Sequence, residues 1–135
     1  MIIREIFLLT NKSNQMEKIE NLIEFIFSVS PDIRYVAVYT DGKLISSSRQ
    51  ELLNPSSSES DKYEELIVNP TLLTLVTQRG NIDCGGAEFV LIRYGNFYEF
   101  VKPVKKGHIS AGIQLDADPL QIITLIQDGL KRFNL

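Results

Sequence analysis

Cys84 and His108 are the sole cysteine and the sole histidine of the sequence. A thiol beside an imidazole could act as a nucleophile with its base, provided that a cation or a helix dipole also lowers the pKa of the thiol. The two residues lie in separate segments, "NIDCGGAEF" and "KKGHISAG", and a structural thiol with a surface imidazole is the simpler interpretation. We therefore expect no catalytic dyad, and we expect partner binding to survive replacement of either residue by alanine.

Carboxylates offer a second possible chemistry, because paired acidic groups can perform general acid–base catalysis. Asp116 and Asp118 could approach Glu99 in a folded sheet, but a helix cap and a solvated turn explain the two aspartates more simply. The segment "CGGAEF" is not a phosphate-binding loop, because it lacks a Lys-Ser/Thr pair and precedes a predicted strand rather than a helix. We expect its glycines to form a tight turn into an edge strand.

A small basic cluster, Lys102, Lys105 and Lys106, lies near a predicted hairpin tip. With Arg93 and Tyr94 it could contact an acidic partner, although a solvated turn is favoured. One cysteine and one histidine are too few for a zinc site. The sequence thus predicts no catalytic residue, no metal site and no cofactor, and we do not expect an enzyme.

Length and composition indicate one globular domain over residues 1–135, with 44% hydrophobic and 23% charged residues. The net charge of -3 provides no basic surface for nucleic acid or anionic membrane. A lone cysteine is typical of a cytoplasmic protein. The apolar start "MIIREIFLLT" is too short for a membrane span and lacks a signal-peptide cleavage site. We expect this N-terminal extension (residues 1–13) to be either an extra strand or a first helical turn.

Hydrophobic periodicity then predicts the elements in order. A helix begins at the capping pair Asn14 and Glu17 and ends before Pro31. A hairpin follows in "IRYVAVYTDGKLISSSR", where the Asp-Gly turn pairs Tyr39 with Leu44 and Val38 with Ile45. Residues 50–60 are Ser-rich and predict a mobile loop.

The segment "KYEELIVNPTLLTLVTQRG" is helical in pattern but contains Pro70. We expect the helix to kink or restart there, with Asn69 as its cap and Gly80 as its end. Apolar residues lie on more than one face of this helix, which suggests a second packing partner. They are Leu72, Leu73, Leu75 and Val76.

A second hairpin, "AEFVLIRYGNFYEFVKPV", turns at Gly95-Asn96 and is apolar on both faces. A further strand, "KKGHISAGIQL", leads to a closing helix that Asp118 caps. The apolar face of that helix contains Leu120, Ile123, Ile126, Leu130 and Phe133. Because both sheet faces need cover, the predicted fold is an α+β, three-layer α/β/α sandwich with a central five-stranded antiparallel sheet. The first and last helices should share one face, and the helix containing Pro70 should cover the other.

This order of elements resembles the Roadblock/dynein light chain family, whose fold is related to the profilin-like and longin folds. "RYVAVYTDGKLISSS" is similar to the family's first hairpin, and "GHISAGIQLDADPLQIITLI" is similar to the strand that runs into its final helix. The resemblance covers roughly residues 14 to 133. Pro70 and the N-terminal extension depart from the family's pattern.

The resemblance implies a non-enzymatic scaffold or regulator that forms homo- or heterodimers, commonly acting on small Ras-like GTPases or motor complexes. It also implies that the strand from Ala87 to Arg93 is an edge that pairs with its copy in a second chain, bringing the middle helices together. The expected homodimer interface contains Phe89, Val90, Leu91, Leu73 and Val76. The expected partner surface, which would receive a GTPase, contains Thr74, Thr77 and Gln78.

Two other functions stay open. A small-molecule sensor of PAS-like or profilin-like architecture would need an apolar cavity with a few convergent polar groups. A small hydrolase or transferase comes last, because the sequence shows no set of nucleophile, base and orienting group.

Overall fold

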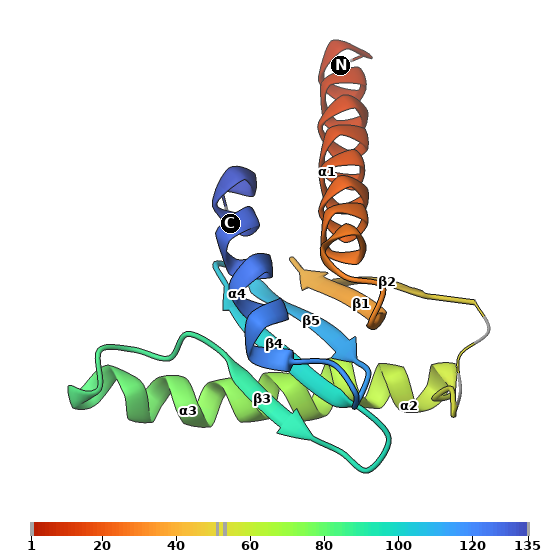
Figure 1. Cartoon of the computed structure of the whole chain (residues 1–135). Coiled ribbons are helices and arrows are strands. Elements are labelled where there is room, and N and C mark those ends of the chain that lie inside the picture. The colour runs from red at the N-terminus through yellow and green to blue at the C-terminus, as the bar shows by residue number, and fades with distance from the viewer. Residues whose placement is uncertain (1, 51, 53, 135) are drawn as a thin grey trace.

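The computed structural model describes residues 2–50, 52 and 54–134, and between residues 2 and 13 it describes only the side chains of Arg4 and Ile6. Helix α1 (Ile2–Val29) is longer than predicted. Asn14 and Glu17 do not start it but lie exposed within it, because no proline or glycine interrupts residues 2–29. Residues 2–13 of the N-terminal extension are thus helical. In Figure 1 this part of α1 projects away from the sheet.

The first hairpin has the predicted register. Strand β1 (Ile33–Thr40) pairs antiparallel with β2 (Lys43–Ser48), and Tyr39 lies opposite Leu44. Asp41 and Gly42 have φ values of 53° and 78°. Both values are positive, as a type I′ turn requires.

The next element is one continuous helical segment, the middle helix. It consists of α2 (Ser58–Tyr63), a π-helical turn η1 (Glu64–Val68) and α3 (Asn69–Asp83). Ser57 caps it, because its side chain accepts a hydrogen bond from the Ser60 N–H. The loop predicted over residues 50–60 therefore gives way to helix at Ser58; residues 51 and 53 of that loop lie outside the described residues.

Pro70 does not restart the middle helix. Val68 and Asn69 both have right-handed helical φ and ψ values, so Asn69 is not the cap that the sequence predicted. The Asn69 N–H instead bonds the carbonyl of Glu64, five residues earlier. This wider π turn lies directly before the proline, whose ring would crowd the carbonyl in an ordinary turn.

Gly80 does not end the middle helix either. Its carbonyl accepts hydrogen bonds from the N–H groups of Cys84 and Gly86, at 3.1 and 3.0 Å. A Cβ atom at Gly80 would lie 2.9 Å from the carbonyl carbon of Gly86. The glycine therefore allows the chain after the helix to fold back closely against it.

The remaining strands form the predicted meander, β3 (Val90–Arg93), β4 (Tyr98–Val104) and β5 (Gly107–Ile113). The single sheet has the order β2-β1-β5-β4-β3, and every pairing is antiparallel. Asp118 caps α4 (Pro119–Leu130), as predicted, and a short 3₁₀ turn η2 (Lys131–Phe133) follows. Within the described residues, β2 and β3 are the two edges of this sheet.

The helices form two layers around the sheet, which confirms the predicted fold class (Figure 1). Helices α1 and α4 cover one face and the middle helix covers the other. Among the described residues, the buried core between α1, α4 and the sheet is formed by hydrophobic side chains, including Leu22, Ile26, Phe100, Ile109, Ile123 and Ile126. Leu120 was predicted to face this core, but its side chain is 57% exposed. Among the described residues, no helix has the length and hydropathy of a membrane span.

Candidate functional site

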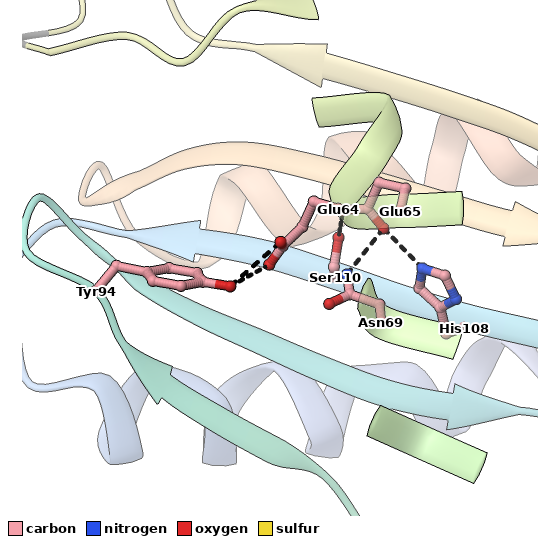
Figure 2. Close-up of polar contacts among 6 residues, drawn as sticks. All are labelled: Glu64, Glu65, Asn69, Tyr94, His108 and Ser110. Carbon is pink, nitrogen blue, oxygen red and sulfur yellow. Dashed lines mark hydrogen bonds and ion pairs between the residues drawn. The ribbon is translucent and has the colours of Figure 1, made fainter. Parts of the chain in front are cut away.

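A buried polar cluster lies between the middle helix and the sheet. It consists of Glu65 and Asn69 from the helix and His108 and Ser110 from β5, each at most 1% exposed. Figure 2 shows the other three side chains converging on the Glu65 carboxylate. That carboxylate accepts hydrogen bonds from Asn69 Nδ2 at 3.1 Å and from Ser110 Oγ, and His108 Nε2 lies 2.6 Å away. Three partners thus compensate the cost of burying a carboxylate.

Local structure places each member of the cluster. Alternation along β5 sends His108 and Ser110 toward the middle helix and Ile109 toward α1 and α4. The π turn brings Glu65 above that strand, one turn before Asn69. In this arrangement Ser110 bonds the carboxylate rather than the imidazole, and the cluster is sealed from solvent. Its geometry therefore suits packing and orientation rather than nucleophilic catalysis.

The possible dyad of Cys84 and His108 does not form. Cys84 is exposed beyond the end of α3, and its thiol donates to Asp83 Oδ1 at 3.5 Å. His108 is buried and faces Glu65, so the prediction of a surface imidazole is wrong. Removing this imidazole would leave Glu65 short of a partner, so His108 has a structural role, while survival of partner binding after its replacement stays a prediction. The signal that could have revealed it was its place in "GHISAGI", an otherwise small and apolar strand.

Glu99 on β4 is a further buried carboxyl group on the same face, only 2% exposed. Burial raises its pKa well above the ordinary range, and the charges of Glu65 and Glu64 raise it further, while hydrogen bonding with Ser110 and Asn69 opposes the shift. Glu99 Oε1 makes no hydrogen bond within the described residues.

The two aspartates considered with Glu99 have ordinary structural roles. Asp118 accepts a hydrogen bond from the Gln121 N–H at 3.3 Å and so caps α4, whereas Asp116 is exposed. The carboxylates that act on Glu99 come instead from the middle helix.

Glu64 extends the acidic region toward the β3–β4 turn. The Tyr94 hydroxyl lies 2.9 and 3.2 Å from its two carboxylate oxygens (Figure 2). Burial raises the pKa of Glu64, and the hydrogen bond from Tyr94 partly opposes this. Burial, followed by the bond to Glu64 and its charge, also raises the pKa of the Tyr94 hydroxyl. The π turn therefore directs two consecutive glutamates toward the sheet.

A pocket of about 820 Å³ opens beside these groups. Its lining comes from β1, the end of β2 and the loop after it, the N-terminal part of the middle helix, the β3–β4 turn, β4 and β5, and includes Tyr35, Asp61, Glu64, Tyr94, Phe97, Glu99 and Gly112. The hydroxyl of Tyr35 is buried and makes no well-formed hydrogen bond in the described structure. Burial raises its pKa and the charge of Glu65 adds to the effect, while the Ser46 side chain opposes it. No local signal in the sequence indicated this pocket, because it depends on six separate segments.

The outer side of the middle helix carries a second candidate surface, the outer stripe. Its members are apolar or aromatic side chains with exposed fractions from 44% to 76%: Tyr63, Leu66, Ile67, Leu75 and Ile82. They lie opposite the helix face that is buried on the sheet, which includes Glu65, Leu73 and Gly80.

The residues predicted for a dimer or partner interface are distributed around this region. Thr74 and Gln78 are exposed at the helix surface, whereas Val76 and Thr77 are half-buried. Leu73 is 8% exposed and faces its own sheet. On the edge side, Val90 is half-buried, and Leu91 and Phe89 pack against the core, with the Phe89 ring 5.8 Å from that of Phe100.

The basic cluster is dispersed in the structure. Lys102 Nζ donates to Gln127 Oε1 on α4 at 3.1 Å, and Lys106 forms an exposed ion pair with Asp41. Gly85 and Gly86 have φ values of 78° and 92° and form the turn that leads toward β3, as predicted.

No family model and no curated protein matches the sequence, but solved structures do. A Roadblock/LC7 domain from Streptomyces avermitilis is 14% identical, with a TM-score of 0.59 over 83% of this chain and 93% of that chain. MglC from Myxococcus xanthus is 8% identical, with a TM-score of 0.56 over 86% and 96%. The gliding protein MglB from Thermus thermophilus is 10% identical, with a TM-score of 0.60 over 87% and 88%. The chain therefore has the Roadblock/LC7 fold that the sequence resemblance implied.

Proposed function

We propose that this Roadblock-type chain is a non-enzymatic homodimeric scaffold that regulates a partner protein. The observation that carries the proposal is the outer stripe, where five large side chains on one helix are exposed. Large apolar side chains exposed along one side of a helix are typical of interaction sites on soluble proteins. No packing requirement of the single chain explains it, because the opposite side of the same helix already covers the sheet.

A second copy of the chain is the occupant that the neighbouring edge favours. Within the described residues, strand β3 has backbone donors and acceptors without strand partners on its outer side, and such edges readily pair with another chain. The close approach of Gly86 to Gly80 starts this edge beside the middle helix. One interface could therefore join both elements, with Val76 and Val90 near its border and Leu73 supporting the helix from below. One structure of MglB, which shares this fold, is described as a tetrameric arrangement.

The proposed partner is a small Ras-like GTPase, as the family resemblance implies. In a dimer, the middle helices of the two copies would form a joint surface with Thr74, Thr77 and Gln78 at its rim. A modest, partly polar contact area is typical of transient regulatory interfaces. Binding should depend on the nucleotide, because GTPase switch segments order around the γ-phosphate.

Light scattering tests the dimer. At about 10 μM, a dimer with a Kd near 1 μM would predominate, and the mass should be twice that of one chain. Leu75→Asp would bury an unpaired charge in the interface and should weaken association at least about tenfold. The matched control is Leu120→Asp, which alters a similarly exposed leucine on α4 and should leave the mass unchanged. A monomeric wild-type protein at this concentration would refute the dimer.

The partner is tested by affinity capture with the immobilised chain from lysates loaded with either a GTP analogue or GDP. A GTPase recovered preferentially in one nucleotide state, and lost with Leu75→Asp, would support the proposal. Recovery without nucleotide preference, or no GTPase in either sample, would count against it.

A second function, small-molecule sensing, is favoured by the pocket beside Glu64 and Glu99. Its volume lies within the range of natural ligand sites, about 300–1,000 Å³. Native mass spectrometry of freshly purified protein tests this function, since a retained metabolite would add its mass to that of the chain. A protein without any retained ligand would count against the sensing function and leave only the scaffold function.

A further inference from the structure

The floor of the pocket is a row of three residues on adjacent strands. Tyr35 on β1 is opposite Gly112 on β5, and Gly112 is opposite Glu99 on β4. Neighbouring strands lie about 4.8 Å apart, so the tyrosine and the glutamate flank a position without a side chain. A Cβ atom at Gly112 would lie 3.2 Å from Arg34 Cγ and 3.6 Å from both Tyr35 Cβ and Phe97 Cδ2. The glycine therefore makes room for the Arg34 and Phe97 side chains, which pack closely over this position between Tyr35 and Glu99.

Both groups that flank the glycine have unused hydrogen-bonding capacity. Glu99 is only 2% exposed and its Oε1 has no partner within the described residues. The buried hydroxyl of Tyr35 makes no well-formed hydrogen bond there either, with only the Ser46 side chain near enough to act on it. Buried polar groups are nearly always satisfied by protein, water or ligand, and an unpaired one costs free energy. Two such atoms in the lining of one pocket are the pattern that a bound polar molecule would complete.

The cations of the pocket are already engaged. Arg34 donates to the Asn54 carbonyl at 2.8 Å and to Gln114 Oε1 at 3.2 Å, and its guanidinium lies 4.8 Å from the centre of the Phe97 ring. Arg49 donates to the carbonyls of Phe27 and Ser30 at 2.8 and 3.0 Å. An anionic ligand would therefore have to displace existing bonds.

Carboxyl groups, by contrast, are numerous, because Asp61, Glu64 and Glu65 line the pocket together with Glu99. Glu65 is engaged by the buried cluster and Asp61 accepts a hydrogen bond from Ser56. Within the described residues, Glu99 is thus the carboxyl group of the pocket with an unpartnered buried oxygen. Tyr94 supplies one donor to Glu64, and its ring lies 5.5 Å from that of Phe97 at the same end of the pocket. Carboxyl oxygens beside aromatic rings suit a ligand that has N–H donors on an apolar or aromatic body.

We propose that this pocket binds a small organic amine, with its apolar body between the middle helix and the Tyr94–Phe97 turn and its nitrogen at Glu99 and Tyr35. This inference rests on the sensing function, specifies the class of its ligand, and is independent of dimerisation. The pocket belongs to the single chain, so a monomeric variant should bind the amine equally well.

Three pairs of probes test the ligand class, each pair sharing a body and differing in the polar end. They are tryptamine and indole-3-acetate, phenethylamine and phenylacetate, and hexylamine and hexanoate. In nuclear magnetic resonance titrations of the full chain, at least one amine should shift the amide signals of Glu64, Tyr94 and Gly112. Its carboxylate counterpart should bind at least about tenfold more weakly. Equal or tighter binding of the acids, or no shift with any amine, would overturn the inference.

Conservative variants identify the binding groups. Tyr35→Phe and Glu99→Gln each remove one hydrogen-bonding function at nearly constant volume, and each should weaken amine binding about tenfold, as expected for a hydrogen bond to a charged group. The control is Tyr39→Phe, which alters the same strand outside the pocket lining and should have no effect. Unchanged affinity in both pocket variants would place the amine elsewhere and overturn the assignment.

Failure of this inference is distinguishable from failure of the sensing function. If native mass spectrometry finds a retained acid or phosphate while the amines do not bind, the pocket is a sensor for another class and the present inference is wrong. An amine that is retained by the wild-type protein and lost from the Glu99→Gln variant would support both the sensing function and the inference about its ligand.

Discussion

One face of the sheet packs against α1 and α4 through purely apolar side chains, whereas the other buries a histidine, a serine and two glutamates beneath the middle helix. Both faces are built from the same strands by simple alternation. In β5, Ile109, Ala111 and Ile113 point one way, and His108, Ser110 and Gly112 point the other. The apolar side needs only shape and volume to pack, while the polar side needs each group to meet a specific partner.

This difference suggests a division of roles between the two faces. The apolar face supplies most of the stability, because burial of apolar area is the dominant favourable contribution to folding. The polar face fixes the position of the middle helix, which carries both candidate functional surfaces: the pocket on its inner side and the outer stripe on its outer side.

The largest expected effect is on the apolar face. Phe100 is fully buried, and Phe100→Ala should lower the free energy of unfolding by about 3–5 kcal/mol, because it removes apolar burial and leaves a cavity. Urea denaturation followed by circular dichroism measures this change. Tyr63→Ala, at a residue that is 63% exposed, is the control and should change stability by less than about 0.5 kcal/mol. Similar losses of stability in both variants would contradict the proposal that the apolar face supplies most of the stability.

A somewhat smaller effect is expected on the polar face. Glu65→Leu removes the common acceptor of His108, Ser110 and Asn69, and should cost about 3 kcal/mol because buried polar partners are left unpaired. The double variant Glu65→Leu, His108→Leu should recover part of this loss, because it replaces a buried polar pair with apolar groups. A double-mutant cycle by urea denaturation measures the coupling. Strictly additive losses would show that the pair is not coupled.

The smallest effect concerns pH. The pKa of Glu99 is raised in the folded chain, so the folded state binds more protons than the unfolded state, and stability should fall as pH rises above the unfolded pKa of about 4.5. Glu64, whose pKa is also raised, contributes in the same direction. Glu99→Gln should therefore gain stability relative to wild type as pH rises above the unfolded pKa, as measured by denaturation at several pH values. Parallel curves of stability against pH for the two proteins would contradict the proposed titration of Glu99.

Local signals in the sequence were sufficient for most of the fold. The Asp41-Gly42 turn, the Asp118 cap and the Gly95-Asn96 turn each depend on neighbouring residues only, and the sequence predicted all three. The order of elements then led to the Roadblock/LC7 fold. Predictions failed where a local signal competed with its surroundings, as with the capping pair Asn14 and Glu17 inside a longer helix.

The candidate site was harder to predict, because its contacts join distant segments. His108 bonds Glu65 only because a π turn accommodates Pro70 and sets the rotation of the helix above β5. The sequence showed the proline and the histidine but not their connection. The predicted interface residues Phe89, Val90, Leu91, Leu73 and Val76 stay predictions until the assembly is measured.

Cys84 has a practical consequence for all of these measurements. It is the only thiol in the chain, it is exposed, and it lies between the end of α3 and the edge strand β3. A maleimide dye or a nitroxide spin label would therefore attach at a single known position without any engineered cysteine. Two labelled copies would report their separation directly by dipolar spectroscopy, at the border of the surface through which they are proposed to meet.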